Sequence, residues 1–413
     1  MDFELVTIGT ELLLGHTVDT NGAELGRALA EVGARLVRRT TVGDDEQAIA
    51  TAVAEALART GRVITTGGLG PTRDDLSKQV VADLYGWPLQ FNEAIWEDIV
   101  SRFRRIGRVP APANRGQAEV PQGAVVLPNR WGTAPGLWLD GPPGLVVMLP
   151  GVPREMKMLL TNEVLPRLKE RTGGTAIRSR AVRTTSIAES AVASRLEGLH
   201  EELHPLTLAY LPSVEGVDLR LTAWNLEPGR AAKLLNAGAE RLETALAEHA
   251  YGRDDDDLAA LVVERLRRQG LRVAVAESCS GGLLGGRITE VPGSSEVFVG
   301  GVICYDDRLK TSLIDVPKAL LTTHGAVSEA VATAMASGVA SRLGTDVALS
   351  ITGIAGPSGA TETKPLGTVW IGYWHRGIAS AVHRVFLGSR AEIRARAVQF
   401  ALHGLFERLG RDS

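Results

Sequence analysis

Short apolar runs alternate with amphipathic segments along the first 170 residues or so. The apolar runs predict strands at 3–8, 36–41, 62–66, 124–127 and 145–149, and helical spacing predicts helices at 21–32, 44–59, 75–85, 93–106 and 155–160. Such alternation is typical of a mainly parallel sheet covered by helices on both faces. Residues 1–172 are therefore predicted to form a three-layer α/β/α domain.

The pattern changes in residues 175–250. Strands are predicted at 179–185, 207–211 and 219–224, and helices at 189–199 and 229–248, which together make a small α+β module. The module has no Gly-x-x-Gly, the loop with which KH domains clamp nucleic-acid backbone. It is interpreted as a spacer or interface module.

In residues 254–413 predicted strands and helices alternate again, and the last predicted element is a helix at 391–409. They begin with four aspartates, 254–257, just before an apolar-periodic helix at 258–266. A run of like charges is usually solvated, and negative charge suits a helix start. The run is interpreted as a linker joined to that helix and not as a metal site. The predicted fold is thus α/β, with two three-layer domains joined by the small module.

Composition narrows the class of protein. The net charge of −3 and pI of about 6.3 do not indicate a nucleic-acid or membrane surface. The two cysteines give no spacing for a disulfide framework or a metal site, which fits a reducing cytoplasm. The N-terminus lacks the features of a signal peptide, and no apolar run reaches the ~18 residues of a membrane span. A cytoplasmic localisation is expected.

The most informative stretch is 273–282, VAVAESCSGG. A small apolar strand runs into serines and a glycine pair and then into a helix, so the turn lies at the carboxyl edge of a sheet, where α/β proteins bind ligands. Backbone N–H groups at the helix start can hold an anion or oxyanion. Ser278 is a candidate nucleophile on this turn, but Ser278 and Ser280 are equally compatible with simple helix capping.

Two further clusters accompany this turn in the C-terminal region. One is the predicted strand 302–305 followed by 306–310, and the other is 350–357 followed by Lys364. No histidine lies in any of the three clusters, so a serine would need another base, and a lysine can serve. Only seven residues of the chain are lysines, and Lys310 and Lys364 are the two inside these clusters. Cys279 is a competing nucleophile, although a small half-buried cysteine is commonly only packing.

Glycine-rich loops follow the predicted strands of the N-terminal region. They are GTELLLG (9–15), GGLGPTRDD (67–75), GTAPG (132–136) and LPGVPREM (149–156). Their backbone N–H groups suit a phosphate, and Asp74 and Asp75 can either hold a divalent metal or cap a helix. Neither a Walker A motif nor a third Rossmann glycine is present, so an ordinary ATPase and a dinucleotide redox enzyme are not expected.

The C-terminal motifs AESCSGG, YDDRLK, HGAVSE and SITGIAGPSG…KPLGTVW resemble the C-terminal domain of the CinA family, over about 155 residues. The resemblance implies a nicotinamide-nucleotide amidohydrolase, which releases ammonia and nicotinate mononucleotide from nicotinamide mononucleotide without a cofactor. It implies Ser278 as nucleophile, with Tyr305 and Lys310 as activating groups. Ser280 replaces a threonine that is frequent in the family. The expected substrate-binding residues of this domain are Glu277, Cys279, Ser280, Gly281, Gly282, Thr352, Gly353, Gly356 and Lys364.

The N-terminal region resembles the molybdopterin-binding fold, in the variant found in CinA-family proteins. This resemblance implies cleavage of the pyrophosphate of ADP-ribose with a divalent metal ion (Mg, Mn or Co). It implies Asp74 and Asp75 as catalytic residues and, with Glu11, as metal ligands. The expected substrate-binding residues are Thr10, Glu11, Asp19, Asn21, Gly67, Gly68, Gly70, Thr72, Thr133, Pro150 and Gly151. The middle module corresponds to the family's KH-type insert.

Together these expectations predict that the chain is a bifunctional hydrolase that recycles pyridine nucleotides. Its partners would be nicotinamide mononucleotide, ADP-ribose and a second copy of the chain in a homodimer, with neither a membrane nor nucleic acid expected. Two alternatives remain open: a non-enzymatic partner of the DNA-uptake or repair machinery, and an N-terminal domain that binds molybdopterin.

Overall fold

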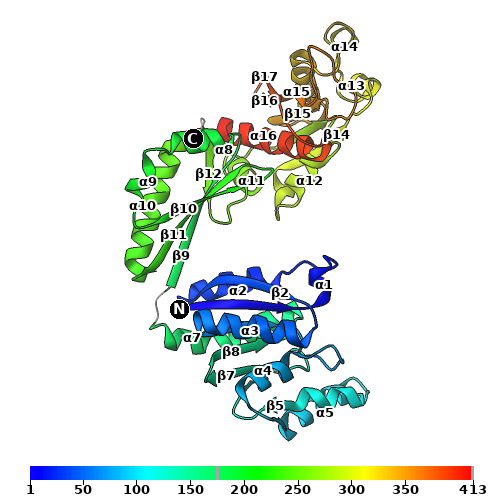
Figure 1. The fold of residues 1–413 in the computed structure, drawn as a ribbon. Helices are drawn as coiled ribbons and strands as arrows, with labels where there is room; N and C mark the ends of the chain where they lie inside the picture. Colours follow the sequence, from blue (N-terminus) through cyan, green and yellow to red (C-terminus); the bar gives the residue numbers. More distant parts are fainter. Residues whose placement is uncertain (174–175, 411–413) are drawn as a thin grey trace. The chain divides into compact units, whose positions relative to one another are not determined.

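The structure, a computed structural model, describes residues 1–173 and 176–410 (Figure 1). It divides into two compact units, residues 1–178 with 223–232 and residues 179–222 with 233–413. Most of the middle module thus belongs to the same unit as the C-terminal domain. None of the described helices is both long enough and apolar enough to span a membrane.

The N-terminal domain is built on a six-stranded sheet of order β2-β1-β3-β8-β7-β6. The first four of these strands are parallel, and β7 and β6 continue the sheet antiparallel. The strands are β1 (Asp2–Ile8), β2 (Arg35–Val42), β3 (Arg62–Thr66), β6 (Val125–Leu127), β7 (Gly136–Gly141) and β8 (Gly144–Leu149). The buried central strands are nearly continuous apolar runs, as strands covered on both faces usually are.

Separate apolar cores lie on the two faces of this sheet. The core on one face includes side chains of α3 and α4, and the core on the other includes side chains of α2 and of the helix that runs from α6 to α7. This confirms the three-layer arrangement. The helices are α1 (Thr10–Leu13), α2 (Asn21–Glu31), α3 (Glu46–Thr60), α4 (Ser77–Tyr85), α5 (Glu93–Arg105), α6 (Pro153–Leu159) and α7 (Leu165–Arg171), with a π-helical turn at Leu160–Val164. A 3₁₀ helix (Pro112–Ala118) and a small sheet of β4 (Leu89–Phe91) and β5 (Glu119–Pro121) complete the domain.

The middle module is a four-stranded sheet of order β10-β11-β9-β12 with helices. The strands are β9 (Ala176–Thr184), β10 (Thr207–Pro212), β11 (Val217–Leu226) and β12 (Ala250–Arg253), and the helices are α8 (Glu189–Arg195), α9 (Leu199–Glu202), α10 (Pro228–Leu246) and a 3₁₀ turn (Ala247–His249). This confirms the α+β class. The sequence pattern did not predict β12, which pairs antiparallel with β9.

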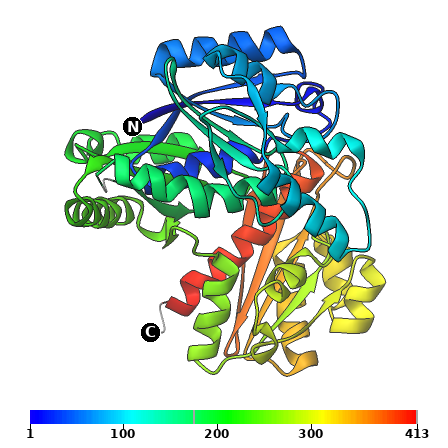
Figure 2. The ribbon, with the colours of Figure 1, turned by 90° about the horizontal axis from the view of Figure 1, so that it is seen from below.

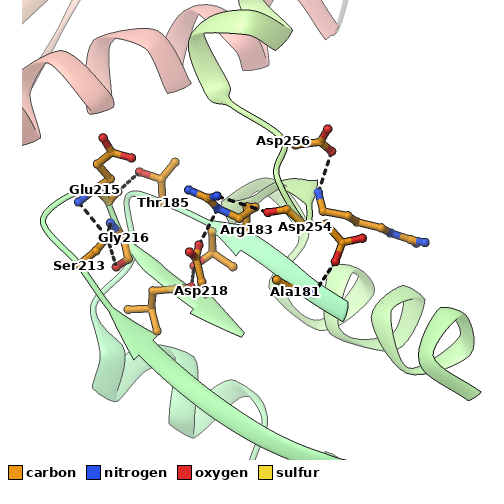
Figure 3. A network of polar contacts seen from close by, with 12 residues as sticks. Ala181, Arg183, Thr185, Ser213, Glu215, Gly216, Asp218, Asp254 and Asp256 are labelled. Carbon is orange, nitrogen blue, oxygen red and sulfur yellow. Dashed lines mark hydrogen bonds and ion pairs between the residues drawn. The ribbon is translucent and has the colours of Figure 1, made fainter. Parts of the chain in front are cut away.

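The aspartate run at 254–257 connects β12 to α11 (Leu258–Arg268), as its interpretation as a linker joined to a helix expected, and it is an ordered turn (Figure 3). Asp254 lies at a φ of 49° and exchanges backbone and side-chain hydrogen bonds with Ala181 of β9. The Asp256 carboxylate accepts from the backbone N–H of Arg253. Asp257 accepts from Ala260 and caps α11, which confirms that the run begins a helix. The charges act locally, on a strand end and a helix start.

The C-terminal domain has a five-stranded sheet of order β14-β13-β15-β16-β17, in which β14, β13 and β15 are parallel. The strands are β13 (Val273–Glu277), β14 (Phe298–Ile303), β15 (Val347–Gly353), β16 (Thr368–His375) and β17 (Ile378–Val385). The helices are α11 (Leu258–Arg268), α12 (Leu283–Thr289), α13 (Asp307–Ile314), α14 (Lys318–His324), α15 (Glu329–Leu343) and α16 (Arg390–Gly410), with a 3₁₀ turn (Ser294–Glu296).

Two cores again cover the two faces of this sheet. One includes side chains of α11, α12 and α16, and the other includes side chains of α13 and α15. In Figure 2 the red helix α16 and the yellow-green α11 lie on one side of the strands and the yellow helices on the other. The domain is therefore a second three-layer α/β/α unit.

One strand of this domain lies earlier than predicted. Residues 302–305 were expected to be a strand, whereas β14 ends at Ile303, so that Cys304 and Tyr305 follow it. The two middle residues of β14 are Gly300 and Gly301, and glycine weakens a strand pattern. Gly301 is required here because a Cβ would lie 2.5 Å from a methyl group of Val275 on the neighbouring strand. The shift places Tyr305 in the loop beyond the sheet edge.

Candidate active sites

The turn after β13 ends with two glycines in the left-handed region. Gly281 and Gly282 have φ values of 60° and 95°, and a Cβ on Gly282 would lie 3.0 Å from Ile303. Only glycine adopts this conformation without strain. The backbone can therefore leave the strand sharply and enter α12, with Ser278 at the corner.

Glu277 holds this turn together. Its buried carboxylate accepts hydrogen bonds from the backbone N–H groups of Gly282, Leu284 and Gly285, at 2.8–3.0 Å. The first N–H groups of α12 are thereby satisfied by a carboxylate, which a helix N-terminus favours. These three donors are not available for the anion or oxyanion that the sequence suggested. Glu277 stabilises the turn and does not line an open site.

The serines are free of the capping role that the sequence left open. The N-cap of α12 is Gly282, which has no side chain to cap the helix, so neither serine is the N-cap residue. Ser278 is 8% exposed, and its hydroxyl has no hydrogen-bond partner among the described residues. Ser280 is fully buried, and neither its hydroxyl nor its backbone N–H is paired within residues 1–173 and 176–410. The turn thus offers a hydroxyl and a nearby N–H donor.

Cys279 lies between the two serines and is 6% exposed. Burial raises the pKa of its thiol to about 11. Because the thiolate is the nucleophilic form, this cysteine is inert at neutral pH. Cys279 belongs to the apolar core beneath the turn.

The second cluster joins the first at the strand ends. Glu277 pairs with Ile303 in the β13–β14 register, and the N–H of Cys304 donates to the carbonyl of Glu277 at 2.8 Å. Lys310 on α13 is 1% exposed, and its Nζ donates to the carbonyl oxygen of Tyr305 at 3.2 Å and to Asp307 Oδ1 at 3.0 Å. A buried lysine thus lies beside the loop that follows β14.

Tyr305 is 59% exposed, and its hydroxyl accepts from Arg390 Nη2 at 3.2 Å. The hydroxyl is therefore directed to Arg390, while Lys310 contacts only the Tyr305 backbone. Arg308, two residues before Lys310, forms an ion pair with Asp306.

The third cluster follows β15. Thr352 is buried, and its hydroxyl donates to the carbonyl of Ala326 at 2.8 Å. Gly353 allows close approach of β16, where a Cβ would lie 2.7 Å from Val369, and Gly356 has a φ of 85°. Lys364 donates to the carbonyl of His324 at 2.9 Å. The HGAVSE segment is therefore held against this cluster.

Two arginines of α16 join the clusters, and the sequence reasoning missed both. Arg390 donates to the carbonyl of Gly356 as well as to the Tyr305 hydroxyl. Arg394 donates to the carbonyl of Ser280 at 2.7 Å, and its Nε is buried without a partner. Their four-residue spacing puts them on one helix face. That signal was weak in a chain with 38 arginines.

In the N-terminal domain, a cavity of about 400 Å³ lies at the carboxyl ends of β1, β3 and β8. Gly67 and Gly68 have φ values of 101° and 68°, and a Cβ on either would collide with Ile8 or Ser77. The predicted residues that line the cavity are Glu11, Gly67, Gly68, Gly70, Asp74, Asp75, Thr133, Pro150 and Gly151, and those the sequence missed include Asp44, Gln117 and Glu155.

Four predicted contacts do not line this cavity and instead hold its loops. The N–H and hydroxyl of Thr10 both donate to Asp44, and Asp19 accepts from the N–H of Gly22. Asn21 donates to the carbonyl of Gly151 at 2.8 Å. The hydroxyl of Thr72 donates to Asp75.

The carboxylates around the cavity differ in the hydrogen bonds that they accept and in their exposure to solvent. Asp75 accepts from the N–H groups of Gly70 and Thr72, both at 2.7 Å, and so shapes the loop. Asp74 is exposed, and the neighbouring Thr72 side chain lowers the pKa of its carboxyl. Across the described ranges, no three His, Cys, Asp or Glu side chains are gathered as metal ligands. The predicted set of Glu11, Asp74 and Asp75 is therefore not arranged as a metal site by protein atoms alone.

The folds and sheet edges together define a protein with two three-layer α/β domains and a small α+β module. Comparison with protein families agrees with this class. Residues 4–170 match the family described as a probable molybdopterin binding domain, residues 179–252 the damage-inducible protein CinA KH domain, and residues 255–409 the CinA C-terminal domain.

The chain belongs to the CinA family. It is 49% identical to a CinA-like protein of Gemmatimonas aurantiaca, over 100% of this chain and 97% of that protein. It is 43% identical to a CinA-like protein of Salinibacter ruber, over 90% of this chain and 91% of that protein. Among solved structures, a CinA superfamily protein of Klebsiella pneumoniae is similar at 34% identity, covering 37% of this chain and 96% of that one, with a TM-score of 0.37.

Proposed function

We propose that the C-terminal domain hydrolyses the carboxamide of nicotinamide mononucleotide. The observation that carries the proposal is Ser278, whose unpaired hydroxyl lies on a glycine turn at the sheet edge. The buried Lys310 follows the adjacent strand, and no histidine lies in the three clusters. A serine with a lysine as base is an established form of nucleophilic catalysis.

The proposed reaction proceeds through an acyl-enzyme. Lys310, as the base, takes the proton of Ser278 as the serine oxygen bonds to the carboxamide carbon, and the same proton then leaves with the departing ammonia. The N–H of Ser280 is the proposed donor to the developing oxyanion. Water, deprotonated by Lys310, attacks the ester, and Ser278 leaves with that proton. The balance is nicotinamide mononucleotide plus water to nicotinate mononucleotide plus ammonia.

Lys364 is the proposed contact for the substrate phosphate. Its Nζ makes one hydrogen bond, to His324, which leaves two N–H donors. Lys364→Ala is expected to raise KM about tenfold with kcat changed less than about twofold, since a phosphate contact acts alike in ground and transition states. Steady-state kinetics on nicotinamide mononucleotide measure both. Loss of kcat with KM unchanged would instead make Lys364 part of the chemistry.

We further propose that the N-terminal cavity cleaves the pyrophosphate of ADP-ribose. Its glycine loops and carboxylates support this. A divalent ion fits such a donor set when substrate phosphates complete it, because Mg²⁺ is commonly held by one or two carboxylates and phosphate oxygens. Asp74 and Glu11 would hold that ion, which would neutralise charge on the phosphates. Asp75 keeps the loop in place through Gly70 and Thr72.

Asp74→Asn is expected to lower ADP-ribose cleavage at least about 100-fold and to leave ammonia release unchanged. Asparagine has nearly the same shape but lacks the charge that a hard cation prefers. The matched control is Asp255→Asn, an exposed aspartate that does not line the cavity. Phosphate-ester products measured with and without divalent metal give the result. Unchanged turnover and metal dependence in Asp74→Asn would refute the assignment.

The match to a probable molybdopterin binding domain supports a second candidate for the same cavity. Calorimetry with ADP-ribose, with and without divalent metal, separates the two: metal-dependent binding of ADP-ribose is expected, and none would favour the pterin. The homodimer stays a prediction that light scattering tests.

A further inference from the structure

Another cavity, of about 460 Å³, lies in the second unit and shares no residue with the two candidate sites described above. Three segments line it: residues 185–189 after β9, residues 212–217 between β10 and β11, and residues 384–400 at the end of β17 and in α16. Figure 3 shows parts of the first two, with Thr185, Ser213 and Glu215 labelled, near a helix in the faint red of the C-terminal residues.

The walls of this cavity are fixed by hydrogen bonds. The hydroxyl of Thr185 donates to the carbonyl of Glu215 at 2.6 Å, and the N–H of Ser213 donates to the carbonyl of Gly216 at 2.8 Å. His403 of α16 is hydrogen-bonded to the carbonyl of Glu248 at 2.8 Å, which joins the helix to the module. The cavity is therefore pre-formed, as binding pockets for small molecules usually are.

Two polar side chains of the lining have no partner among the described residues. Gln399 is 4% exposed, and its amide nitrogen is buried and unpaired. The hydroxyl of Ser186 is also buried and unpaired, on a residue held at a φ of 61°. Buried polar groups are nearly always hydrogen-bonded, so two such groups at one cavity indicate missing ligand atoms. Rotation about the last side-chain bond lets Gln399 present either its donor or its acceptor.

The rest of the lining is apolar or balanced in charge. Phe386 and Phe400 lie with ring centroids 6.0 Å apart at 65°, beside Ile187, Val214 and Val385. The charged residues are two arginines and two glutamates: Arg384, Arg396, Glu189 and Glu215. Both arginines already donate to backbone carbonyls. Such a lining favours an uncharged ligand over a phosphate.

We propose that this cavity binds a flat, uncharged heteroaromatic molecule that carries neighbouring hydrogen-bond donor and acceptor atoms. The ring packs against Phe386 and Phe400, and its polar edge pairs with the Gln399 amide and the Ser186 hydroxyl. Two sources share this chemistry, a nucleobase and a pyridine carboxamide. The volume is within the range of ~300–1,000 Å³ that is usual for such ligands.

Ligand-observed saturation-transfer NMR on the full chain tests the proposal, with adenosine, uridine and nicotinamide as probes and benzene as the apolar control. At least one polar probe is expected to bind more tightly than benzene. Gln399→Leu, which keeps the size and fits an apolar wall, is expected to weaken that binding about tenfold. The matched control Gln90→Leu, at an exposed position in the other unit, should bind like the parent chain.

Ser186→Gly is the second variant, because glycine adopts a positive φ without strain and the fold should be kept. It removes the hydroxyl and is expected to weaken binding about fivefold. Binding of adenosine or uridine would identify the ligand class as a nucleobase, and binding of nicotinamide would identify it as a pyridine carboxamide. Because the probes also resemble parts of the proposed substrates, the binding that counts is the part that Gln399→Leu removes, since Gln399 lines this cavity and neither candidate active site. Equal binding by all variants, or no binding beyond that of benzene, would overturn the proposal and leave a cavity that holds only water.

Discussion

Ser278→Ala is expected to reduce ammonia release from nicotinamide mononucleotide by at least ~10³-fold, since removing a catalytic nucleophile leaves only binding and oxyanion stabilisation. Ser278 makes no side-chain hydrogen bond that the fold requires. The turn itself is held by Glu277 and the two glycines, so the alanine variant should keep its structure. Cleavage of ADP-ribose by the same variant should be unchanged and serves as an internal control.

Cys279→Ala is the matched test of the competing nucleophile. Its thiol is buried, and its pKa is raised to about 11 by that burial, so little thiolate exists at neutral pH. This variant should keep most of its deamidase activity, with a moderate loss of melting temperature from the missing core atom. The opposite pattern, with activity kept in Ser278→Ala and lost in Cys279→Ala, would refute the serine assignment.

Lys310→Arg and Lys310→Ala are both expected to lower kcat for deamidation by at least ~100-fold, the size of a general-base contribution. Arginine keeps the positive charge but does not release its proton in a protein, so it cannot act as the base. Lys318→Arg, at the exposed start of α14, is the matched control and should have no effect.

Burial complicates this test because Lys310 is among the largest fully buried side chains of the chain. Lys310→Met keeps the unbranched shape without an amine, so a melting curve near that of the parent chain would separate lost chemistry from lost structure. A near-native kcat in Lys310→Arg would show that a fixed positive charge, and not a base, is what the site requires.

The fold was largely predictable because helical and strand periods alternate clearly in the sequence. The exceptions have local causes. Two glycines hid the first half of β14, and β12 is a four-residue strand that depends on its pairing with β9. The aspartates at 254–257 are largely exposed, as the sequence predicted, but the hydrogen bonds that order them, to Ala181 and to the start of α11, could not be predicted from the local pattern.

The candidate sites were predictable only where the chemistry is local. The glycine turn around Ser278 and the loop at 67–75 are continuous motifs, and both lie at sheet edges. Arg390 and Arg394 contact the three clusters of the C-terminal domain only because the folded chain brings α16 beside them, so the sequence pattern could not predict these contacts. The sequence also did not predict that Glu277 accepts the first N–H groups of α12, because these three partners are backbone groups and leave no side-chain pattern.

The most direct test of this account is the time course of ammonia and nicotinate mononucleotide formed from nicotinamide mononucleotide by the purified chain, without added metal, beside the Ser278→Ala variant. The account predicts that the parent chain forms the two products in equal amounts and that the variant forms neither above background. Intact substrate after prolonged incubation with the folded parent chain, or equal product from the variant, would contradict it.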